Sequence, residues 1–469
     1  MKSSRLSVLA LVAFAVACGA ASNPDVAAKA GDTELSSARL AEVLAQSQAP
    51  LEKDVARNIA ELWVNYQLVG LAAANNDSLS DAKVMQEALW SQIDNIRVKK
   101  FYDNVSKGWD SLSPGTDESR YMSGEALAAR HILVKTEPNA TPEQIGVAKK
   151  KADGILAEAT TANFAVLAAK SDEPGAKERG GDLGLFQRGM MVPEFEKCLL
   201  VLKPGEISKE VCQTSFGFHI IYRSPFADVA EKFAPVAKQR NVAIAESTYL
   251  AKLETSHGVK IESSAPVKAK AIAKNPLGYV KDNAALASYK GGSLSASRFA
   301  QWVMAYPPQA QIRPQLVAAP DTLVEKFVKQ IVRNELVLKQ ADSAKSQADT
   351  SELQVLFMNF KSDVPRVWGG LGIDPTKLTD SANTSKPKVA AARVDSFYNR
   401  LVKNEVPFVE VSYPLAHALQ SKYPFSINET GLDKVIEKAK TLRASSDSSK
   451  AQTAPTGTAP ATPPDTTQK

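Results

Sequence analysis

Histidine and cysteine are scarce in this chain of 469 residues, which contains four His and three Cys. These residue types supply most ligands of zinc and related metals, and here no group of them has metal-binding spacing. The glycine-rich run 369–372 neither follows a convincing strand nor opens a clear helix, so we assign it no nucleotide-binding role. The sequence therefore predicts no metal site and no cofactor.

Aromatic residues and concentrated positive charge are also lacking. Phe, Trp and Tyr make up 7% of the chain, and the Lys and Arg behind its net charge of +6 are scattered. Nucleic-acid-binding proteins usually gather basic residues on one face or in one tract, so the sequence predicts no nucleic-acid partner. The hydrophobic fraction of 44% is ordinary for a globular protein, and abundant alanine favours helices.

Long hydrophobic runs are absent apart from a short one at the start. Lys2 and Arg5 precede the apolar run Leu6–Ala17, which indicates a signal peptide over residues 1–17. A run of about a dozen residues is too short to cross a bilayer. Residues 15–19 resemble a bacterial lipobox, which predicts that Cys18 is lipidated and anchors an exported chain on the periplasmic or cell-envelope side. Ordinary signal-peptide cleavage, which would leave a soluble exported protein, is the alternative.

The length suggests two or three domains. After a short tether over residues 18–25, the periodicity predicts a helical region over residues 26–121. A second, mainly helical region is expected over residues 227–444. The Ala/Thr/Pro/Ser-rich end, residues 445–469, has no apolar periodicity and is predicted to be disordered.

Two segments of these helical regions are similar to each other. The stretch that begins at Val26 and ends at Leu40 echoes Leu286 to Phe299 if one residue is skipped in the turn. Each copy reads as a hairpin followed by a helix. An internal repeat and convergence of two simple units are both compatible with this pattern.

The central stretch, residues 126–226, has the richest pattern. Alternation predicts strands at 127–134 and 218–223, and a Thr-Pro-x-Gln start at Thr141 predicts a helix. Strand and helix signals then alternate, which indicates a small α+β domain. The stretch also contains six distinctive blocks in order: Ala129–Val134, Ser171–Gly175, Gly180–Gly184, Arg188–Glu196, Leu202–Ser208 and Thr214–Ile221.

These blocks closely resemble the parvulin family of peptidyl-prolyl isomerases. The resemblance implies a small antiparallel sheet with surrounding helices, so the expected class is α+β with mainly helical flanks. The layout of one parvulin-like domain between helical regions is similar to the SurA and PrsA type of extracytoplasmic folding factor. That layout implies a client-binding cradle built from the helical parts.

The resemblance also implies a site. Its apolar slot for a proline ring would be formed by Leu183, Met191 and Phe195, with Phe216 as a further substrate-binding residue. An aliphatic side chain, a flexible thioether and an aromatic ring suit a five-membered ring. Plain core packing is the alternative for these side chains.

The polar centre implied by the resemblance consists of His131, His219, Thr214 and Glu173. Family members usually carry Asp or Cys where this chain has Glu173, so the carboxylate is expected to be displaced by about an ångström. Asp172 is a possible substitute for it. The two histidines could carry protons or could hold neighbouring strands in place.

The remaining cysteines, Cys198 and Cys212, form an even pair if Cys18 carries lipid. In an oxidising compartment a disulfide between them is one hypothesis, and two buried free thiols are the other. The chain has only one base and one acid between Lys135 and Thr141, whereas a phosphate clamp requires converging Arg or Lys. Phosphoserine-proline specificity is therefore not expected.

The sequence thus predicts an exported peptidyl-prolyl cis-trans isomerase that assists the folding of secreted or envelope proteins. Its expected partners are unfolded or nascent polypeptides containing Xaa-Pro bonds, and the membrane through a lipid anchor. The alternative is a client-binding holdase that retains the domain without meaningful catalysis. A purely structural envelope lipoprotein is disfavoured because it gives the slot residues no task.

Overall fold

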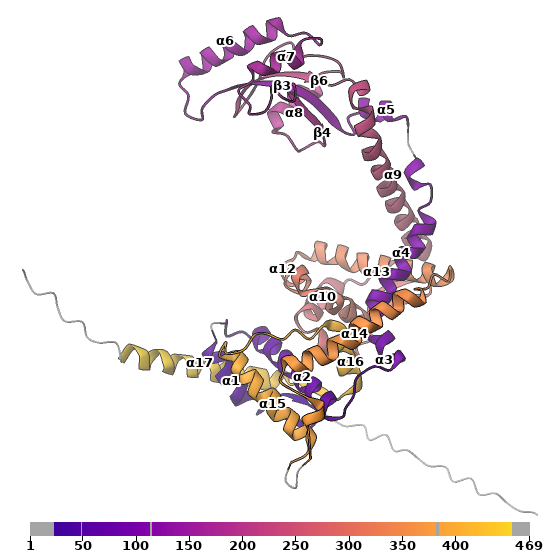
Figure 1. Cartoon of the computed structure of the whole chain (residues 1–469), viewed down its shortest axis with the longest axis vertical. Helices are drawn as coiled ribbons and strands as arrows, with labels where there is room; N and C mark the ends of the chain where they lie inside the picture. Colours follow the sequence, from indigo (N-terminus) through magenta and orange to yellow (C-terminus); the bar gives the residue numbers. More distant parts are fainter. Residues whose placement is uncertain (1–22, 48, 113–114, 381–383, 453–469) are drawn as a thin grey trace, which may run out of the picture. The chain divides into compact units, whose positions relative to one another are not determined.

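The computed structural model describes residues 23–47, 49–112, 115–380 and 384–452, with side chains described up to residue 445. The predicted signal peptide and Cys18 lie outside these ranges. The chain forms two compact units, shown in Figure 1. The described residues up to Phe101 and from His257 onward form a helical unit, and Tyr102–Ser256 form a mixed α/β unit. Among the helices described, none is both long and apolar enough to cross a bilayer.

The helical unit is assembled from both ends of the chain. Its first part contains β1 (Val26–Ala30), β2 (Thr33–Ser36), α1 (Ser37–Gln46), α2 (Lys53–Ala74), α3 (Ala82–Ala88) and most of α4 (Trp90–Val105). Its second part contains β7 (Lys260–Ile261), α10 (Ala265–Lys274), β8 (Ala285–Tyr289), β9 (Gly292–Ser295), α11 (Ala296–Ala305), α12 (Ile312–Ala318), α13 (Asp321–Ser343), α14 (Thr350–Gly370), α15 (Lys386–Val402), α16 (Tyr413–Lys422), β10 (Phe425–Ile427) and α17 (Glu429–Gln452).

One hydrophobic core joins these two parts. Trp63 and Tyr66 of α2 are fully buried in the same cluster as Tyr398 of α15 and Leu432 of α17. Arg57 of α2 reinforces this junction, because its guanidinium donates two hydrogen bonds, of 3.0 and 2.9 Å, to the carboxylate of Glu429. The regions expected at 26–121 and 227–444 are therefore not independent, since they share one core.

The suspected repeat has a structural counterpart in two matching hairpins. Val26 pairs with Ser36 and Ala285 pairs with Ser295, and each hairpin has its irregularity at the same place. Ser36 and Ser295 both cap the following helix by accepting a backbone N–H. Each hairpin also gains a third strand on the same side, giving sheets ordered β10-β1-β2 and β7-β8-β9. The strands correspond residue for residue, so no residue has to be skipped.

The α/β unit contains a four-stranded antiparallel sheet ordered β4-β3-β6-β5. Its elements are α5 (Asp117–Met122), β3 (Leu127–Lys135), α6 (Pro142–Glu158), α7 (Phe164–Leu167), β4 (Asp182–Phe186), α8 (Pro193–Leu200), β5 (Cys212–Thr214), β6 (Gly217–Arg223) and α9 (Phe226–His257). The α+β class predicted for this stretch is confirmed. Thr141 caps α6 through the predicted capping box.

The two faces of this sheet are buried by different helices. Alternate residues of β3 and β6, such as Ile132 and Ile220, face a core under α6 and α7. The intervening residues, such as Ala129 and Ile221, face a second core formed with α8. Because successive side chains of a strand point to opposite faces, His131 and His219 belong to the α8 side.

The unit boundaries differ from those predicted from the sequence. Helix α5 and α9 up to Ser256 belong to the α/β unit, and Tyr121 of α5 packs against the rings of Phe226 and Phe233 of α9. The N-terminal region therefore ends near Phe101 rather than at residue 121, and the C-terminal region begins near His257 rather than at residue 227.

The predicted disordered tail also begins too early. Helix α17 continues to Gln452, although the apolar periodicity stops before residue 445. The residues beyond that point include no Pro or Gly before Pro455, so nothing in them breaks a helix already started by Leu432 and Val435. Residues 453–469 lie outside the described part of the chain.

Candidate active site

Two neighbouring strands bring His131 and His219 together. In the antiparallel register of β3 and β6, His131 lies opposite Ile221 and Leu133 lies opposite His219, so the two histidines are diagonal neighbours on one face. Their rings are stacked, with centroids 5.3 Å apart and an interplanar angle of 17°. Both side chains are buried, with 6% and 5% of their surface exposed. A sheet that pairs these strands therefore fixes both imidazoles.

A continuous set of hydrogen bonds runs through the two imidazoles. The Oγ1 atom of Thr214 lies 2.8 Å from Nε2 of His219, and the two Nδ1 atoms are 3.1 Å apart. Nε2 of His131 lies 2.5 Å from Oε2 of Glu173. The other carboxylate oxygen of Glu173 pairs with Nη2 of Arg179 at 2.8 Å. We call this set, from Thr214 to Arg179, the histidine ladder.

The hydrogens of the ladder have one consistent assignment when Glu173 is ionised. A carboxylate only accepts, so His131 donates from Nε2, and as a neutral ring it accepts at Nδ1. His219 then donates from Nδ1 and accepts at Nε2 from the Thr214 hydroxyl. The Thr214 Oγ1 in turn accepts the Phe216 backbone N–H at 3.1 Å. Every polar atom of the two rings is thereby satisfied with both rings neutral.

Burial favours these neutral rings. Desolvation lowers the pKa of His131 below its ordinary value, against the opposing effect of Glu173. Desolvation, with a further contribution from His131, lowers the pKa of His219 to about 4. Near pH 7 both rings are therefore predominantly uncharged, as the hydrogen assignment requires.

The three predicted slot residues lie in one apolar cluster beside the ladder. Phe195 of α8 is buried there, and Leu183 of β4 and Met191 pack against the same cluster while remaining partly exposed. The Phe195 ring meets both imidazoles edge to face, at 5.6 Å from His131 and 5.3 Å from His219. The slot residues are thus neither scattered nor remote from the histidines.

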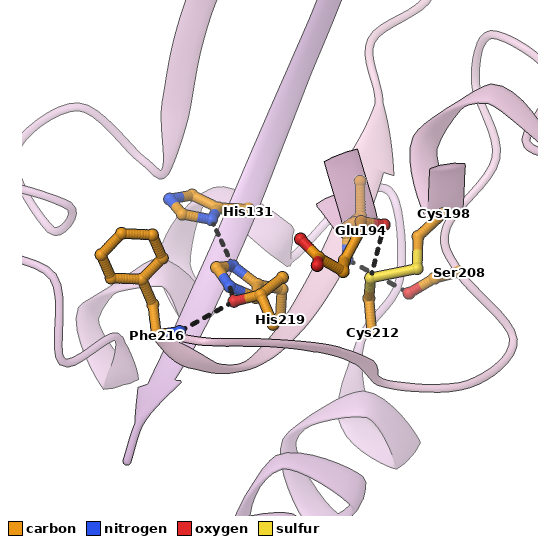
Figure 2. Close-up of a disulfide and its surroundings, with 9 residues drawn as sticks. His131, Glu194, Cys198, Ser208, Cys212, Phe216 and His219 are labelled. Carbon is orange, nitrogen blue, oxygen red and sulfur yellow. Dashed lines mark hydrogen bonds between the residues drawn. A yellow bond between two sulfur atoms is a disulfide. The ribbon is translucent and has the colours of Figure 1, made fainter. Parts of the chain in front are cut away.

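Phe216 has a different environment from the other slot candidates. It lies in the turn between β5 and β6 and keeps 54% of its surface exposed. Figure 2 shows it beside the two imidazoles. Its ring is therefore not packed in the core, and its contact with a bound chain stays a prediction.

Comparison with known proteins assigns this unit to a family. Residues 117–224 match the model of the PPIC-type PPIase domain. This segment is a PPIC-type PPIase domain. The match includes α5, in agreement with the packing of Tyr121 inside this unit.

Individual relatives match the PPIase domain and part of its surroundings. A Helicobacter pylori protein named provisionally as a peptidyl-prolyl cis-trans isomerase is 34% identical over 182 residues, which are 34% of this chain and 57% of the relative. The foldase protein PrsA of Caldanaerobacter subterraneus is 37% identical over 150 residues, 31% of this chain and 44% of that protein. The chain therefore spans about half the length of these curated relatives.

Among solved structures, PrsA from Bacillus anthracis aligns with 42% of this chain and 99% of its own, at 23% identity and a TM-score of 0.18. The comparison adds no residue to the site.

A disulfide joins Cys198 of α8 to Cys212 of β5 in the PPIase domain (Figure 2), one of the two alternatives that the sequence left open. Cys198 lies one helical turn after Phe195. Cys212 lies two residues before Thr214 and opposite His219 in the strand register. The disulfide therefore connects α8, which carries Phe195, to β5, which carries Thr214.

Asp172, the possible substitute for Glu173, has other partners in the PPIase domain. Its carboxylate accepts the backbone N–H of Lys135 at 2.9 Å and pairs with Nζ of Lys151 at 2.9 Å. These contacts hold the loop against β3 and direct Asp172 away from the histidines. Glu173 contacts Nε2 of His131 directly, and the displacement of about an ångström expected from its extra methylene stays a prediction.

Sequence reasoning missed two charged residues of the PPIase domain. Arg179 pairs with Glu173, and Glu196 accepts the backbone N–H groups of Gly189 and Met191 through one oxygen, at 2.7 and 3.2 Å. Glu196 thereby holds the loop that carries Met191. Both residues fall within or beside the quoted blocks, but nothing in their spacing indicates their partners.

Close backbone contacts explain two glycines of the PPIase domain. Gly181 has a φ of +72°, and a Cβ atom there would lie 2.5 Å from the carbonyl oxygen of His131. Gly217 has a φ of +134°, and a Cβ there would lie 2.2 Å from the carbonyl oxygen of Val134. Both positions require glycine for the chain to approach β3 closely. No group of three or more His, Cys, Asp or Glu that could hold a metal occurs in the described ranges.

Proposed function

We propose that this protein is a peptidyl-prolyl cis-trans isomerase that assists the folding of exported polypeptides. The observation that carries the proposal is the contact of Phe195 with both imidazoles of the ladder, with Met191 and Leu183 partly exposed beside it. A proline ring requires an apolar cluster that is partly open, and its peptide bond requires rigid polar groups beside it. The histidine ladder supplies these groups.

The chemistry of isomerisation explains this requirement. Rotation about the peptide bond is opposed by amide resonance, which gives a barrier of about 20 kcal/mol. A catalyst must therefore bind the twisted amide more tightly than the planar one. The twisted amide has less charge separation, so an apolar slot favours it over water. No nucleophile and no bond cleavage are involved.

The ladder serves in this proposal to position groups rather than to carry protons. Each of the four ring nitrogens has a partner, and both pKa values lie below the ordinary one. Because both imidazoles are neutral and fully hydrogen-bonded, they hold the Phe195 ring in one position. Binding to a slot that is already rigid costs less conformational entropy. Glu173 and Arg179 form the partly exposed end of the ladder, with 28% and 39% of their side-chain surfaces exposed. Glu173 is placed to act on the carbonyl of the bound peptide.

We further propose that the clients are unfolded secreted or envelope polypeptides. Relatives of the domain are named foldase PrsA and chaperone SurA. The signal-peptide pattern of residues 1–17 supports export, and Cys18 is the proposed lipid attachment that would hold the chain on the outer side of a membrane. The second candidate is a holdase, which binds clients without catalysis. Segments from both ends of the chain form one core in the helical unit, so this unit could bind clients without the PPIase domain.

Exchange spectroscopy on a short Ala-Pro peptide tests the isomerase proposal. The full chain should accelerate cis/trans exchange at substoichiometric concentration. Unchanged exchange, together with suppressed aggregation of an unfolded client, would favour the holdase instead.

Radioactive or alkyne-tagged palmitate tests the anchor. Label should enter the wild-type chain during expression in a bacterial host and should be absent from Cys18→Ala. Equal labelling of the two chains, or no labelling of either, would remove the anchor from the proposal without affecting the isomerase.

A further inference from the structure

Two of the three slot side chains come from one loop and the helix that follows it. Met191 ends the loop 187–191, and Phe195 lies in the first turn of α8, four residues later. Phe195 is buried against both imidazoles, whereas Met191 packs on the same apolar cluster and remains partly exposed. The shape of the slot therefore depends on how the loop is held against α8.

The internal structure of the loop 187–191 does not attach it to α8. The loop contains one turn, in which the Met190 N–H donates to the carbonyl oxygen of Gln187 at 3.2 Å. Gly189 has a φ of +84°, and a Cβ atom at this position would have no neighbour within 4 Å, so the turn is not enclosed. Val192, which leads into α8, makes no side-chain cap on the helix. The position of the loop must come from another contact.

The carboxylate of Glu196 supplies this contact. Its Oε1 atom accepts the backbone N–H of Gly189 at 2.7 Å and that of Met191 at 3.2 Å. Glu196 is itself held at the start of α8, where its own N–H donates to the carbonyl oxygen of Val192 at 3.1 Å. Hydrogen bonds to an ionised acceptor are about twice as strong as neutral ones. One side chain thus ties the loop to the helix that carries Phe195.

We propose that Glu196 is a positioning residue for prolyl isomerisation and sets the affinity of the slot for the proline ring by holding Met191 in place. This role rests on the isomerase function proposed above, because it concerns the same slot. Without the Glu196 carboxylate, Met191 would occupy its binding position for only a fraction of the time. The apparent affinity for a proline peptide falls by that fraction.

Glu196 also carries a charge that favours the start of α8, because acidic side chains near a helix N-terminus are stabilising. Glu194 lies in the same first turn with the same charge, and it is exposed. Glu194→Ala therefore removes a similar helix contribution and leaves the loop attached. This variant is the matched control that separates helix stability from positioning.

Isomerisation of an Ala-Pro peptide by the full chain, over a series of peptide concentrations, measures KM and kcat separately. Glu196→Ala should raise KM about tenfold and keep kcat within about twofold of the wild type, because the bound ring restores the loop position. Glu196→Gln retains an oxygen acceptor and should recover most of the affinity. An unchanged KM in Glu196→Ala, or an equal rise in Glu194→Ala, would overturn the proposal.

A double-variant cycle tests whether Glu196 acts through Met191. In the Met191→Ala background there is no thioether left to position, so Glu196→Ala should raise KM by less than about twofold further. A full tenfold rise in that background would show that Glu196 acts by another route and would overturn the positioning role. Glu196→Asp, whose carboxylate is one methylene shorter, replaces Glu196→Ala in these comparisons if that variant does not fold.

Amide hydrogen exchange measures the attachment without an isomerase assay. The N–H groups of Gly189 and Met191 should exchange about tenfold faster or more in Glu196→Ala than in the wild type. In Glu194→Ala they should exchange at the wild-type rate. Exchange that is unchanged in Glu196→Ala would overturn the attachment of the loop.

Failure of this proposal differs from failure of the isomerase function. A wild-type chain that does not accelerate prolyl exchange would remove the isomerase. The dissociation constant of the same peptide, measured by titration with the full chain, would then replace KM in each comparison. Acceleration by the wild type, together with a wild-type KM in Glu196→Ala, would remove the positioning role alone.

Discussion

The Nδ1 atoms of His131 and His219 lie 3.1 Å apart, and this contact joins the two strands that form the centre of the PPIase domain. Two nitrogens at this distance can share one hydrogen only if one donates and the other accepts. The contact therefore fixes complementary tautomers, and the partners Glu173 and Thr214 decide which ring donates.

Removing the Thr214 hydroxyl should destabilise the domain. In Thr214→Val, Nε2 of His219 loses its donor and the Phe216 N–H loses its acceptor, while the volume stays similar. We expect a loss of about 1–3 kcal/mol in the free energy of unfolding, measured by urea denaturation. Thr161→Val, at an exposed position of the same domain, should change it by less than about 0.5 kcal/mol. Equal values for the two variants would contradict the ladder.

The Glu173 carboxylate should matter for catalysis far more than a neighbouring acid. Glu173→Ala removes the partner of both His131 and Arg179, and we expect kcat/KM for a proline peptide to fall about a hundredfold. Glu178→Ala, an exposed acid in the same loop, is the matched control and should retain the wild-type rate. A wild-type rate in Glu173→Ala would exclude the carboxylate from the site.

Reducing the disulfide should loosen both sides of the site. Cys198 and Cys212 are 14 residues apart, and closing a loop of that length stabilises a fold by about 3 kcal/mol. The Cys198→Ser/Cys212→Ser double variant should lose up to that amount by urea denaturation. Its kcat/KM should also fall, because Phe195 and Thr214 lie on the linked elements. Addition of a phosphine reductant should lower the free energy of unfolding of the wild type. It should not change that of the double variant.

The stability of the PPIase domain should decrease in mild acid. The folded-state pKa of His219 is about 4, compared with an ordinary value of 6.5, because burial disfavours its cation. Between these pH values the unfolded chain binds more protons than the folded one, so stability is lost as the pH falls from about 6.5 towards 4. His219 alone contributes up to about 3 kcal/mol to this loss. In urea titrations across this range, His219→Gln should show a shallower dependence on pH, and an equally steep one would assign the effect to other groups.

Much of the PPIase domain could be predicted because its signals are local. The Thr141 capping box, the alternation in β3 and the glycines before Asp182 each act within a few residues, and the ordered blocks place His131, His219 and Phe195 in one domain. The partners of Glu173 could not be predicted in this way. The loop that carries Arg179 folds back on itself, and the distance from Glu173 to His131 depends on side-chain torsions that the sequence pattern does not encode.

The helical unit shows a second limit of sequence reasoning. Periodicity indicated most helices, but it does not reveal that Arg57 meets Glu429 across 372 positions of the chain. Such contacts depend on how the two ends of the chain assemble. The boundary between the two units near Phe101 could not be predicted for a related reason. Tyr121 belongs to the α/β unit because it packs against rings of α9, which lie about a hundred residues later in the chain.

The central claim is most directly tested by the exchange rate of a proline peptide in the presence of a chain whose slot has been emptied. We predict that the wild type and Val201→Ala, which alters a side chain on the surface of the same domain that is 78% exposed, accelerate cis/trans exchange equally. The Leu183→Ala/Met191→Ala variant should remain folded and should lose most of this acceleration. Full acceleration by the emptied slot, or none by the wild type, would contradict the account.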